Sequence, residues 1–238
     1  MEFGVVSRAE AEELHLTKLI LNHFHAGIHS NNFQQTTICS QTFFLLILSL
    51  TWERLTSFEP LKTMLKQIFE NKTLKPSEKT KAVLKLVGDK KIKVSELLVF
   101  AEAAKDPIKA TCIEAIEFAT QKSPNVLDTA GFNFIVDSLG DKAPRIKWES
   151  AKVIANTCHL FSSKLDKAIA GLLENSDHEG TVVRWSAATA LSKIIVLKTK
   201  HQKDLVKTCK AIMEREEKNS IRKIYGEGIK RFEICPSG

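Results

Sequence analysis

The chain is poor in the residues that build turns and strands. Its 238 residues include ten Gly, six Pro and one Tyr. Proteins made of many short strands need frequent turns and favour aromatic and β-branched residues. Lys, Glu, Ala and Leu are abundant instead, and all four favour helices. The composition therefore favours helices over strands.

Paired cysteine motifs are also missing. The chain has an odd number of cysteines, widely spaced and without a CxxC pair, at positions 39, 112, 158, 209 and 235. This pattern argues against a disulfide framework or a zinc site and suits a reducing compartment. We therefore expect a cytoplasmic protein. Cys112, Cys158 and Cys209 fall in helical patterns, where a free cysteine packs as a small hydrophobe.

The sequence lacks the common catalytic motifs. It contains no GxSxG, phosphate loop, HExxH or Gly-rich dinucleotide fingerprint. Cys158 and His159 are adjacent, but neighbours on a helix point about 100° apart and do not face each other. Glu102, Glu114 and Glu117 fit solvated helix faces. We therefore predict no catalytic residue, no cofactor and no small-molecule substrate.

Three histidines near the start raise the question of a metal site. His25 and His29 are four positions apart and would share a helix face, with His23 close by. No acidic residue or cysteine lies within that stretch to complete a ligand set. We predict no metal site there.

Residues 1–55 look unlike the rest. They hold three basic and five acidic residues, whereas the remainder carries a formal charge of +9. The apolar run 43–50 is too short for a membrane span, which needs about 20 residues, and begins too far from the start for a signal peptide. A buried or capping helix is the preferred interpretation of this irregular segment. A membrane anchor and a poorly ordered non-native extension are the alternatives, and we do not expect a membrane partner.

A short motif recurs four times in the second half of the chain. An aliphatic residue precedes a basic one, and the basic residues lie 38, 37 and 38 positions apart, at Lys109, Lys147, Arg184 and Arg222. A small or apolar residue follows four places later, at Ile113, Ala151, Ala188 and Gly226. An aliphatic residue comes three places after that, at Ile116, Ile154, Leu191 and Ile229. A repeat of this length indicates that the chain stacks copies of one small unit.

Each repeat is predicted to be a pair of helices. The predicted helices are 94–104 with 108–121, 132–139 with 145–161, 164–174 with 181–197, and 202–217 with 220–232. Helical patterns at 60–69 and from Pro76 to Gly88 form a degenerate first repeat or cap. One pair cannot bury both of its apolar stripes, so neighbouring pairs must stack. We predict an all-α, right-handed solenoid over 56–238, with repeats 57–92, 93–127, 128–163, 164–200 and 201–236.

Residues 93–236 resemble the HEAT-repeat family, of which armadillo repeats are close relatives. The family pattern is a turn Asp, a Pro, Val-Arg, a small residue and a Leu; it is matched best by Asp141, Pro144, Ile146, Lys147, Ala151 and Ile154. The next unit matches without the Pro, at Asp177, Val183, Arg184, Ala188 and Leu191. Ile113 replaces the small residue in one unit, and the last unit lacks the turn Asp. The resemblance implies stacked helical hairpins with an extended contact surface and does not identify a partner.

The four basic residues would form a row if the repeats stack. The row could offer positive charge along a concave face to an acidic partner or phosphates. It could instead pair with turn carboxylates and brace the adjoining repeat; the carboxylates expected for this are Asp106, Asp141 and Asp177. The second interpretation is favoured, because the turn Asp belongs to the family pattern.

Two tryptophans, Trp148 and Trp185, directly follow two of these basic residues. Each lies three positions before the inward small residue, which favours core packing. An exposed aromatic pair that grips a peptide or a base is the alternative. Lys223 occupies the same place in the last unit, so the position can lie near solvent.

These features predict a non-enzymatic module for protein–protein interaction or scaffolding. Its second helices would present a basic concave surface to a protein partner with an acidic surface. The alternative is a nucleic-acid-binding protein similar in fold to alkylpurine DNA glycosylases. That model needs an Asp near the aromatic pair, whereas Asp137 and Asp166 fall in first helices. A lyase-like accessory protein is a further alternative without identifying residues.

Overall fold

The structure is a computed structural model of the whole chain, and it describes residues 60–234. All regular elements in this range are helices, and no strand is present in it. The predictions for residues 1–55, including the capping helix and the three histidines, lie outside the described residues. No helix within 60–234 is long and apolar enough to cross a membrane.

The first helix pair is helix 60–70 followed by α3 (Pro76–Gly88). Pro76 suits the first turn of α3 because a proline has no amide hydrogen, and none is needed there. The helix ends where the amide of Asp89 donates to the carbonyl oxygen of Lys85 at 2.8 Å. The next residue, Lys90, takes a left-handed conformation with φ of 55°. Both helices lie where the sequence predicts them.

Four further pairs follow, as the 37- to 38-residue motif predicts. They are α4 (Val94–Glu102) with α5 (Asp106–Lys122), α6 (Thr129–Asp137) with α7 (Pro144–Thr157), α8 (Asp166–Asn175) with α9 (Thr181–Ile194), and α10 (Gln202–Arg215) with α11 (Asn219–Ile234). Short 3-10 turns occupy Pro124–Val126, Ser138–Gly140 and Cys158–Lys164. The repeat boundaries drawn around these pairs stay a prediction.

Several predicted helices run past their observed ends, and the overshoot is largest for the helix predicted at 145–161. The sequence pattern extends it from 145 to 161, but α7 ends at Thr157 and a 3-10 turn follows. Phe161 leaves the helical path with φ of −118° and ψ of 29°. Its ring stacks on Phe132, with the centroids 4.2 Å apart. The chain after α7 therefore packs back on α6, the first helix of the same pair.

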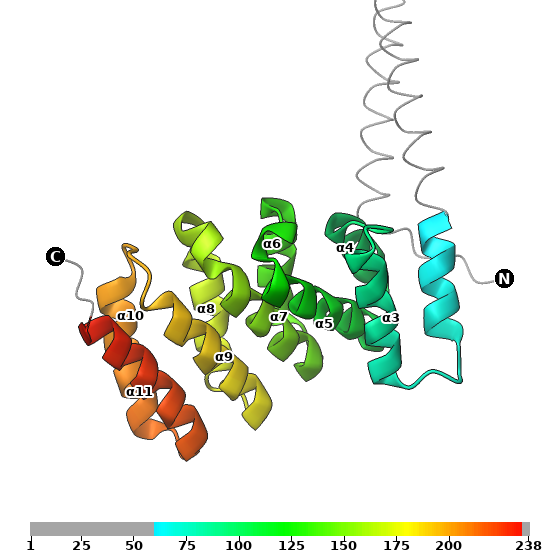
Figure 1. Cartoon of the computed structure of the whole chain (residues 1–238). Coiled ribbons are helices and arrows are strands. Elements are labelled where there is room, and N and C mark those ends of the chain that lie inside the picture. Colours follow the sequence, from blue (N-terminus) through cyan, green and yellow to red (C-terminus); the bar gives the residue numbers. More distant parts are fainter. Residues whose placement is uncertain (1–59, 235–238) are drawn as a thin grey trace, which may run out of the picture. The chain divides into compact units, whose positions relative to one another are not determined.

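The helices form two layers (Figure 1). The second helices of the pairs contact one another in the order α3, α5, α7, α9 and α11. The first helices α4, α6 and α8 make the other layer, and each packs on its own second helix. Each inner second helix thus has neighbours on three sides, and its fourth side faces solvent.

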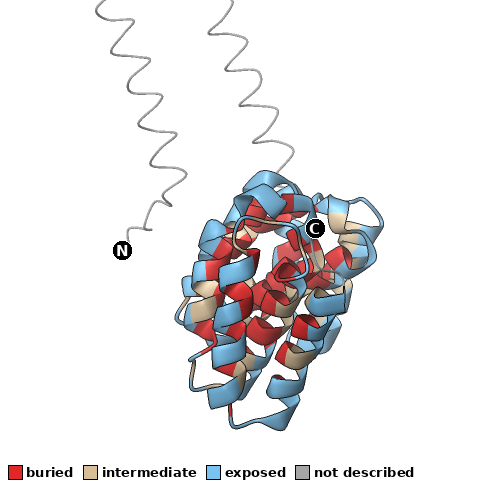
Figure 2. Cartoon of the chain, turned by 90° about the vertical axis from the view of Figure 1, so that its left-hand side faces the viewer, coloured by how far each residue is buried: buried red, intermediate tan, exposed pale blue. Residues whose placement is uncertain are grey.

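The core lies between the layers, where Figure 2 shows the buried residues. The repeated inward positions Ile113, Ala151 and Ala188 are buried, as predicted. The positions three residues further on are buried in all four units, at Ile116, Ile154, Leu191 and Ile229. Gly226 is half-buried. The recurring motif therefore marks the side of each second helix that packs inward.

Helices α9 and α11 approach each other most closely at Gly228. A Cβ atom at this position would lie 2.7 Å from the Cβ of Ser192 and 3.0 Å from its Cα. The Ser192 hydroxyl donates to the carbonyl oxygen of Ile224 at 3.0 Å. At Gly226 a Cβ would meet Met213 Sδ at 3.6 Å, an ordinary contact. The close approach therefore requires glycine at 228.

Candidate functional site

The basic residues Lys109 and Arg184 tie one helix pair to the next by ion pairs. Lys109 Nζ lies 2.8 Å from Asp141 Oδ2, in the turn before α7. Arg184 Nε lies 3.0 Å from Glu216 Oε2, in the turn before α11. All four side chains are at most one-fifth exposed. These ion pairs therefore hold a second helix to the helix pair that follows it.

Lys147 makes the corresponding contact with neutral acceptors. Its Nζ donates to Asn175 Oδ1 at 3.0 Å and to the carbonyl oxygen of Leu139 at 3.1 Å. Asn175 is buried at the end of α8, and its own amide donates to the same Leu139 carbonyl. Three successive second helices therefore begin with a cation bound to the following pair.

The ion pairs shift the pKa values of their carboxylates. Partial burial acts to raise the pKa of Asp141, but the hydrogen bonds from Lys109 and from the Ala143 amide outweigh it and lower the pKa. For Glu216 the same opposition holds, and the hydrogen bond from Arg184 lowers the pKa. Both carboxylates are therefore held in the charged form.

The sequence identifies the partner carboxylate correctly at only one of three turns within the described residues. Asp141 pairs with Lys109 as predicted. Asp177 binds Arg215 instead of Arg184, and Asp106 is exposed without an ion pair within 60–234. The long side chain of Arg184 reaches Glu216, which the family pattern does not include. Two consecutive glutamates, Glu216 and Glu217, stand in the turn before α11, and they were the sequence feature that could have indicated this partner.

Arg222, the fourth basic residue, is different. It is exposed, and its guanidinium has no hydrogen-bond or ion-pair partner in the described part of the chain. No described helix pair follows α11 to offer an acceptor. Its charged end is therefore available to another molecule.

The two tryptophans lie on neighbouring second helices, α7 and α9, but in different surroundings. Trp148 is half-buried, and its Nε1 donates to Glu149 Oε1 at 2.7 Å. The Trp185 side chain is 40% exposed. The expected core packing therefore holds in part for Trp148, whereas Trp185 reaches solvent.

An apolar stripe runs along the solvent side of α9. Val182 is 51% exposed, and Val196, just beyond the end of the helix, is 39% exposed. Val182 and Trp185 lie about one turn apart on the same side of α9, because 3.6 residues make a turn, and Val196 lies in the turn after the helix. We call Val182, Trp185 and Val196 the α9 stripe. Scattered exposed apolar residues are common, but an exposed valine and tryptophan one turn apart, with a further exposed valine just after the helix, merit explanation.

A polar network lies between α5 and α7, beside Trp148. Lys152 Nζ lies 3.0 Å from Glu149 Oε2 and 3.4 Å from Glu117 Oε2. Both carboxylate side chains are at most 6% exposed, and burial raises the pKa of Glu149. Phe118, on α5, lies under the Lys152 ammonium at 5.8 Å from its ring centroid.

The polar network extends to α3 and corrects an expectation from the sequence. Arg145 donates to Glu114 Oε2 at 2.8 Å, and the hydroxyl of Thr80 donates to the same oxygen at 2.6 Å. Glu114 is half-buried and Glu117 is buried, so neither occupies a solvated face. Both lie on sides of α5 that approach a neighbouring second helix. Helical spacing alone does not reveal that contact.

The described cysteine thiols are buried, and the two aspartates considered for a glycosylase lie away from the tryptophans. Burial raises the pKa of the Cys112 and Cys209 thiols to about 12 and that of Cys158 to about 11. Such thiols do not act as nucleophiles near neutral pH. Asp137 and Asp166 lie in the first-helix layer as predicted, where Lys167 and Lys200 bind them. The described residues hold no group of three His, Cys, Asp or Glu able to bind a metal.

No protein-family model matches the chain, and no curated protein sequence matches it. Similar solved structures exist. The CpcE–CpcF complex of phycocyanin lyase from a Nostoc species matches with a TM-score of 0.56 and 17% identity. The match covers 70% of this chain and 95% of that chain.

Designed repeat proteins are similar to the same degree. A computationally designed armadillo repeat protein for modular peptide recognition matches with a TM-score of 0.55 and 13% identity, over 72% of this chain and 81% of that one. A designed armadillo repeat protein in complex with the peptide (KR)4 matches with a TM-score of 0.54 and 14% identity, over the same shares of the two chains. The described residues therefore adopt the all-α solenoid fold of HEAT and armadillo repeats.

Proposed function

We propose that this chain is a non-enzymatic interaction module that binds a segment of another protein along the exposed side of its second helices. The observation that carries the proposal is the α9 stripe. Its apolar side chains are exposed on α9 and in the turn after it, and packed neighbours hold α9 on three sides. Large apolar side chains, tryptophan above all, supply most of the energy at protein interfaces.

The proposal divides the predicted binding residues into two groups. Lys109, Lys147 and Arg184 brace adjacent repeats, because their charged ends are already bound. Trp185 is the main anchor, Trp148 lines the edge of the surface, and Arg222 adds positive charge beyond it. Binding on this surface relies on apolar contact more than on a row of charge.

Several observations support binding over catalysis. The similar solved structures include armadillo proteins described as binding peptides, and the buried thiols leave no exposed cysteine nucleophile in residues 60–234. The phycocyanin-lyase neighbour makes an accessory role in an enzyme the second candidate. Free buried cysteines also fit the proposed cytoplasmic location.

The test is capture of partners by the full chain and by two variants. Val182→Glu combined with Trp185→Glu places charge on the α9 stripe. Val99→Glu is the matched control, because Val99 is 54% exposed on α4, in the other layer. Pull-down with mass spectrometry should recover a protein with the unaltered chain and with Val99→Glu, and lose it with the double variant.

Two results would contradict the proposal. The first is a partner that the double variant retains at an unchanged level while circular dichroism shows both variants folded. The second is tight binding to a DNA duplex with a steep dependence on salt, which would favour the nucleic-acid alternative.

A further inference from the structure

The positive charge of the chain is concentrated in its first described helix pair. Residues 60–93 contain ten lysines, no arginine and three acidic residues. Their formal charge of +7 equals that of the entire chain. The remaining 204 residues are therefore close to neutral as a whole.

Few of these lysines form an ion pair or a hydrogen bond through their ammonium group. Lys66 Nζ lies 3.7 Å from Glu70 Oε1, with both side chains about two-thirds exposed. Lys79 donates to the carbonyl oxygen of Phe69 at 2.7 Å. The ammonium groups of the others have no partner in the described part of the chain; they are Lys62, Lys72, Lys75, Lys81, Lys85, Lys90, Lys91 and Lys93.

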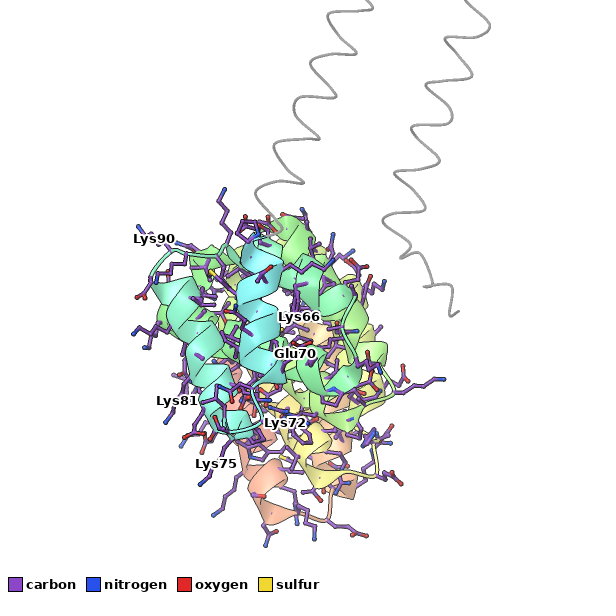
Figure 3. The ribbon with its side chains drawn as sticks, turned by 90° about the vertical axis from the view of Figure 1, so that its right-hand side faces the viewer. Lys66, Glu70, Lys72, Lys75, Lys81 and Lys90 are labelled. Carbon is purple, nitrogen blue, oxygen red and sulfur yellow. The ribbon has the colours of Figure 1, made fainter. Side chains whose placement is uncertain are left out.

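The acidic residues of this pair do little to neutralise the lysines. Glu78 accepts a hydrogen bond from the backbone amide of Lys75 at 2.7 Å and so caps α3. Figure 3 shows the labelled lysines spread around the outer end of the stack, over helix 60–70, the loop after it and α3. We call the exposed lysines at this end of the stack the lysine rim.

The same helix pair contains an apolar groove, and Lys91 is among the residues that line it. A cleft of about 340 Å³ lies between helix 60–70 and α3, lined mainly by Met64, Ile68, Leu74 and Leu86, with Lys91 at its side. These apolar side chains are only half-buried. The volume is in the range of protein clefts that take up ligand groups, about 300 Å³ and above.

We infer that the groove of the first helix pair binds an acidic amphipathic helix of a partner protein. Apolar side chains of such a helix would enter the cleft, and its carboxylates would meet the lysine rim. A nucleic acid offers no apolar side for the groove and is gripped best by arginine and exposed aromatic rings. The pair lacks arginine, and the ring of its Phe69 stacks on Phe100. A flat lipid surface would not use a cleft.

This inference goes beyond the proposed function, since it concerns a different surface and a partner of stated chemistry. The test measures fluorescence anisotropy of a labelled peptide of about 18 residues, five helical turns, with Leu and Glu at helical spacing. The full chain is titrated with it at low and moderate salt. The same peptide with Ser in place of Leu, a DNA duplex, and vesicles containing phosphatidylserine serve as comparison probes.

Variants locate the site. Lys72→Gln, Lys75→Gln and Lys91→Gln together should weaken peptide binding about tenfold, since close charge pairs contribute roughly 0.5 kcal/mol each. The matched control is Lys203→Gln, Lys207→Gln and Lys230→Gln, exposed lysines of the last helix pair, with less than about a twofold effect. Leu74→Ser, in the loop before α3, should also weaken binding while the circular dichroism spectrum is unchanged.

The inference requires that the Leu/Glu peptide binds better than every comparison probe. It is overturned if the peptide does not bind, if the Ser peptide binds equally, or if the duplex or the vesicles bind more tightly. Equal effects of the two lysine triples would also overturn it. The Val182→Glu, Trp185→Glu variant should bind the peptide normally, so that failure here and failure of the proposed function are distinguishable.

Discussion

Helices α7 and α9 begin with the same motif and present opposite surfaces. Both start with an aliphatic residue, a cation and a tryptophan, and both bury the small residue that follows, Ala151 or Ala188. On α7 the tryptophan is half-buried and hydrogen-bonded, within a polar network that includes two neighbouring helices. On α9 it is exposed, one turn after the exposed Val182.

The residue after the tryptophan accounts for much of this difference. On α7 it is Glu149, which accepts from Trp148 Nε1 and binds Lys152. On α9 it is Ser186, which is buried and whose hydroxyl has no hydrogen-bond partner in the described residues. A serine is too short to hold the indole. The difference between Glu149 and Ser186 therefore helps explain why the tryptophan is hydrogen-bonded on α7 and exposed on α9.

The largest expected effect comes from removing Trp148, and removing Trp185 is the comparison. Trp148→Ala should lower the free energy of unfolding by about 2–3 kcal/mol, because a half-buried indole and its hydrogen bond are lost. Trp185→Ala should cost less than about 1 kcal/mol, since its ring is partly in water already. Urea unfolding followed by circular dichroism measures both. Equal losses would remove the contrast between the two helices.

The polar network beside Trp148 depends on the ammonium group of Lys152, which binds Glu117 and Glu149. Lys152→Met keeps the length of the side chain but leaves Glu117 and Glu149 buried without a cation. We expect a loss of about 2 kcal/mol, below the usual cost for a fully buried pair because Lys152 is partly exposed. Thr189→Met, at the corresponding position of α9, should change the free energy of unfolding by less than about 0.5 kcal/mol. A neutral Lys152→Met would show that the network does not stabilise α7.

The position of α9 against α11 depends on one glycine. Gly228→Ala should lower the stability by about 1–2 kcal/mol, because the new methyl group would overlap Ser192. Gly226→Ala should raise the stability by up to about 1 kcal/mol, since alanine favours the helix and has room there. Thermal melts of the two variants should therefore shift in opposite directions. A shift in the same direction would contradict the close approach at Gly228.

Arg184, on α9, binds the carboxylate of Glu216, whereas Lys147, on α7, binds the neutral amide of Asn175. Glu216→Gln should lower the stability by about 1 kcal/mol at neutral pH. The pKa of Glu216 is lowered on folding, so its contribution is present above the ordinary value of 4.5 and disappears as the pH falls through the lowered value. The two unfolding curves should therefore converge in acid. Glu217→Gln, the exposed neighbour, is the control and should show no such convergence.

The fold was predictable because each helix pair repeats one local pattern. Ile146 and Ala151, or Val183 and Ala188, mark the buried side of a helix whatever the partner is. The kink at Phe161 was not predictable, since it depends on stacking against a ring almost thirty residues earlier.

The site was predictable only in part. Asp141 follows from the family pattern, whereas Glu216 depends on the reach of Arg184 across to the next pair. Glu117 looks solvated in a helical pattern because the pattern does not show that α7 covers it. The concentration of lysine in residues 60–93 was countable from the sequence, but the groove in the same helix pair depends on two helices packing together.

The central claim is that Trp185 is open to solvent where Trp148 is held by its network, and fluorescence quenching tests it most directly. Two full-length variants each retain one of these tryptophans, with the other and Trp52 replaced by Phe. Acrylamide should quench Trp185 several-fold more efficiently than Trp148, and the emission of Trp185 should lie at longer wavelength. Equal quenching, or stronger quenching of Trp148, would contradict the account.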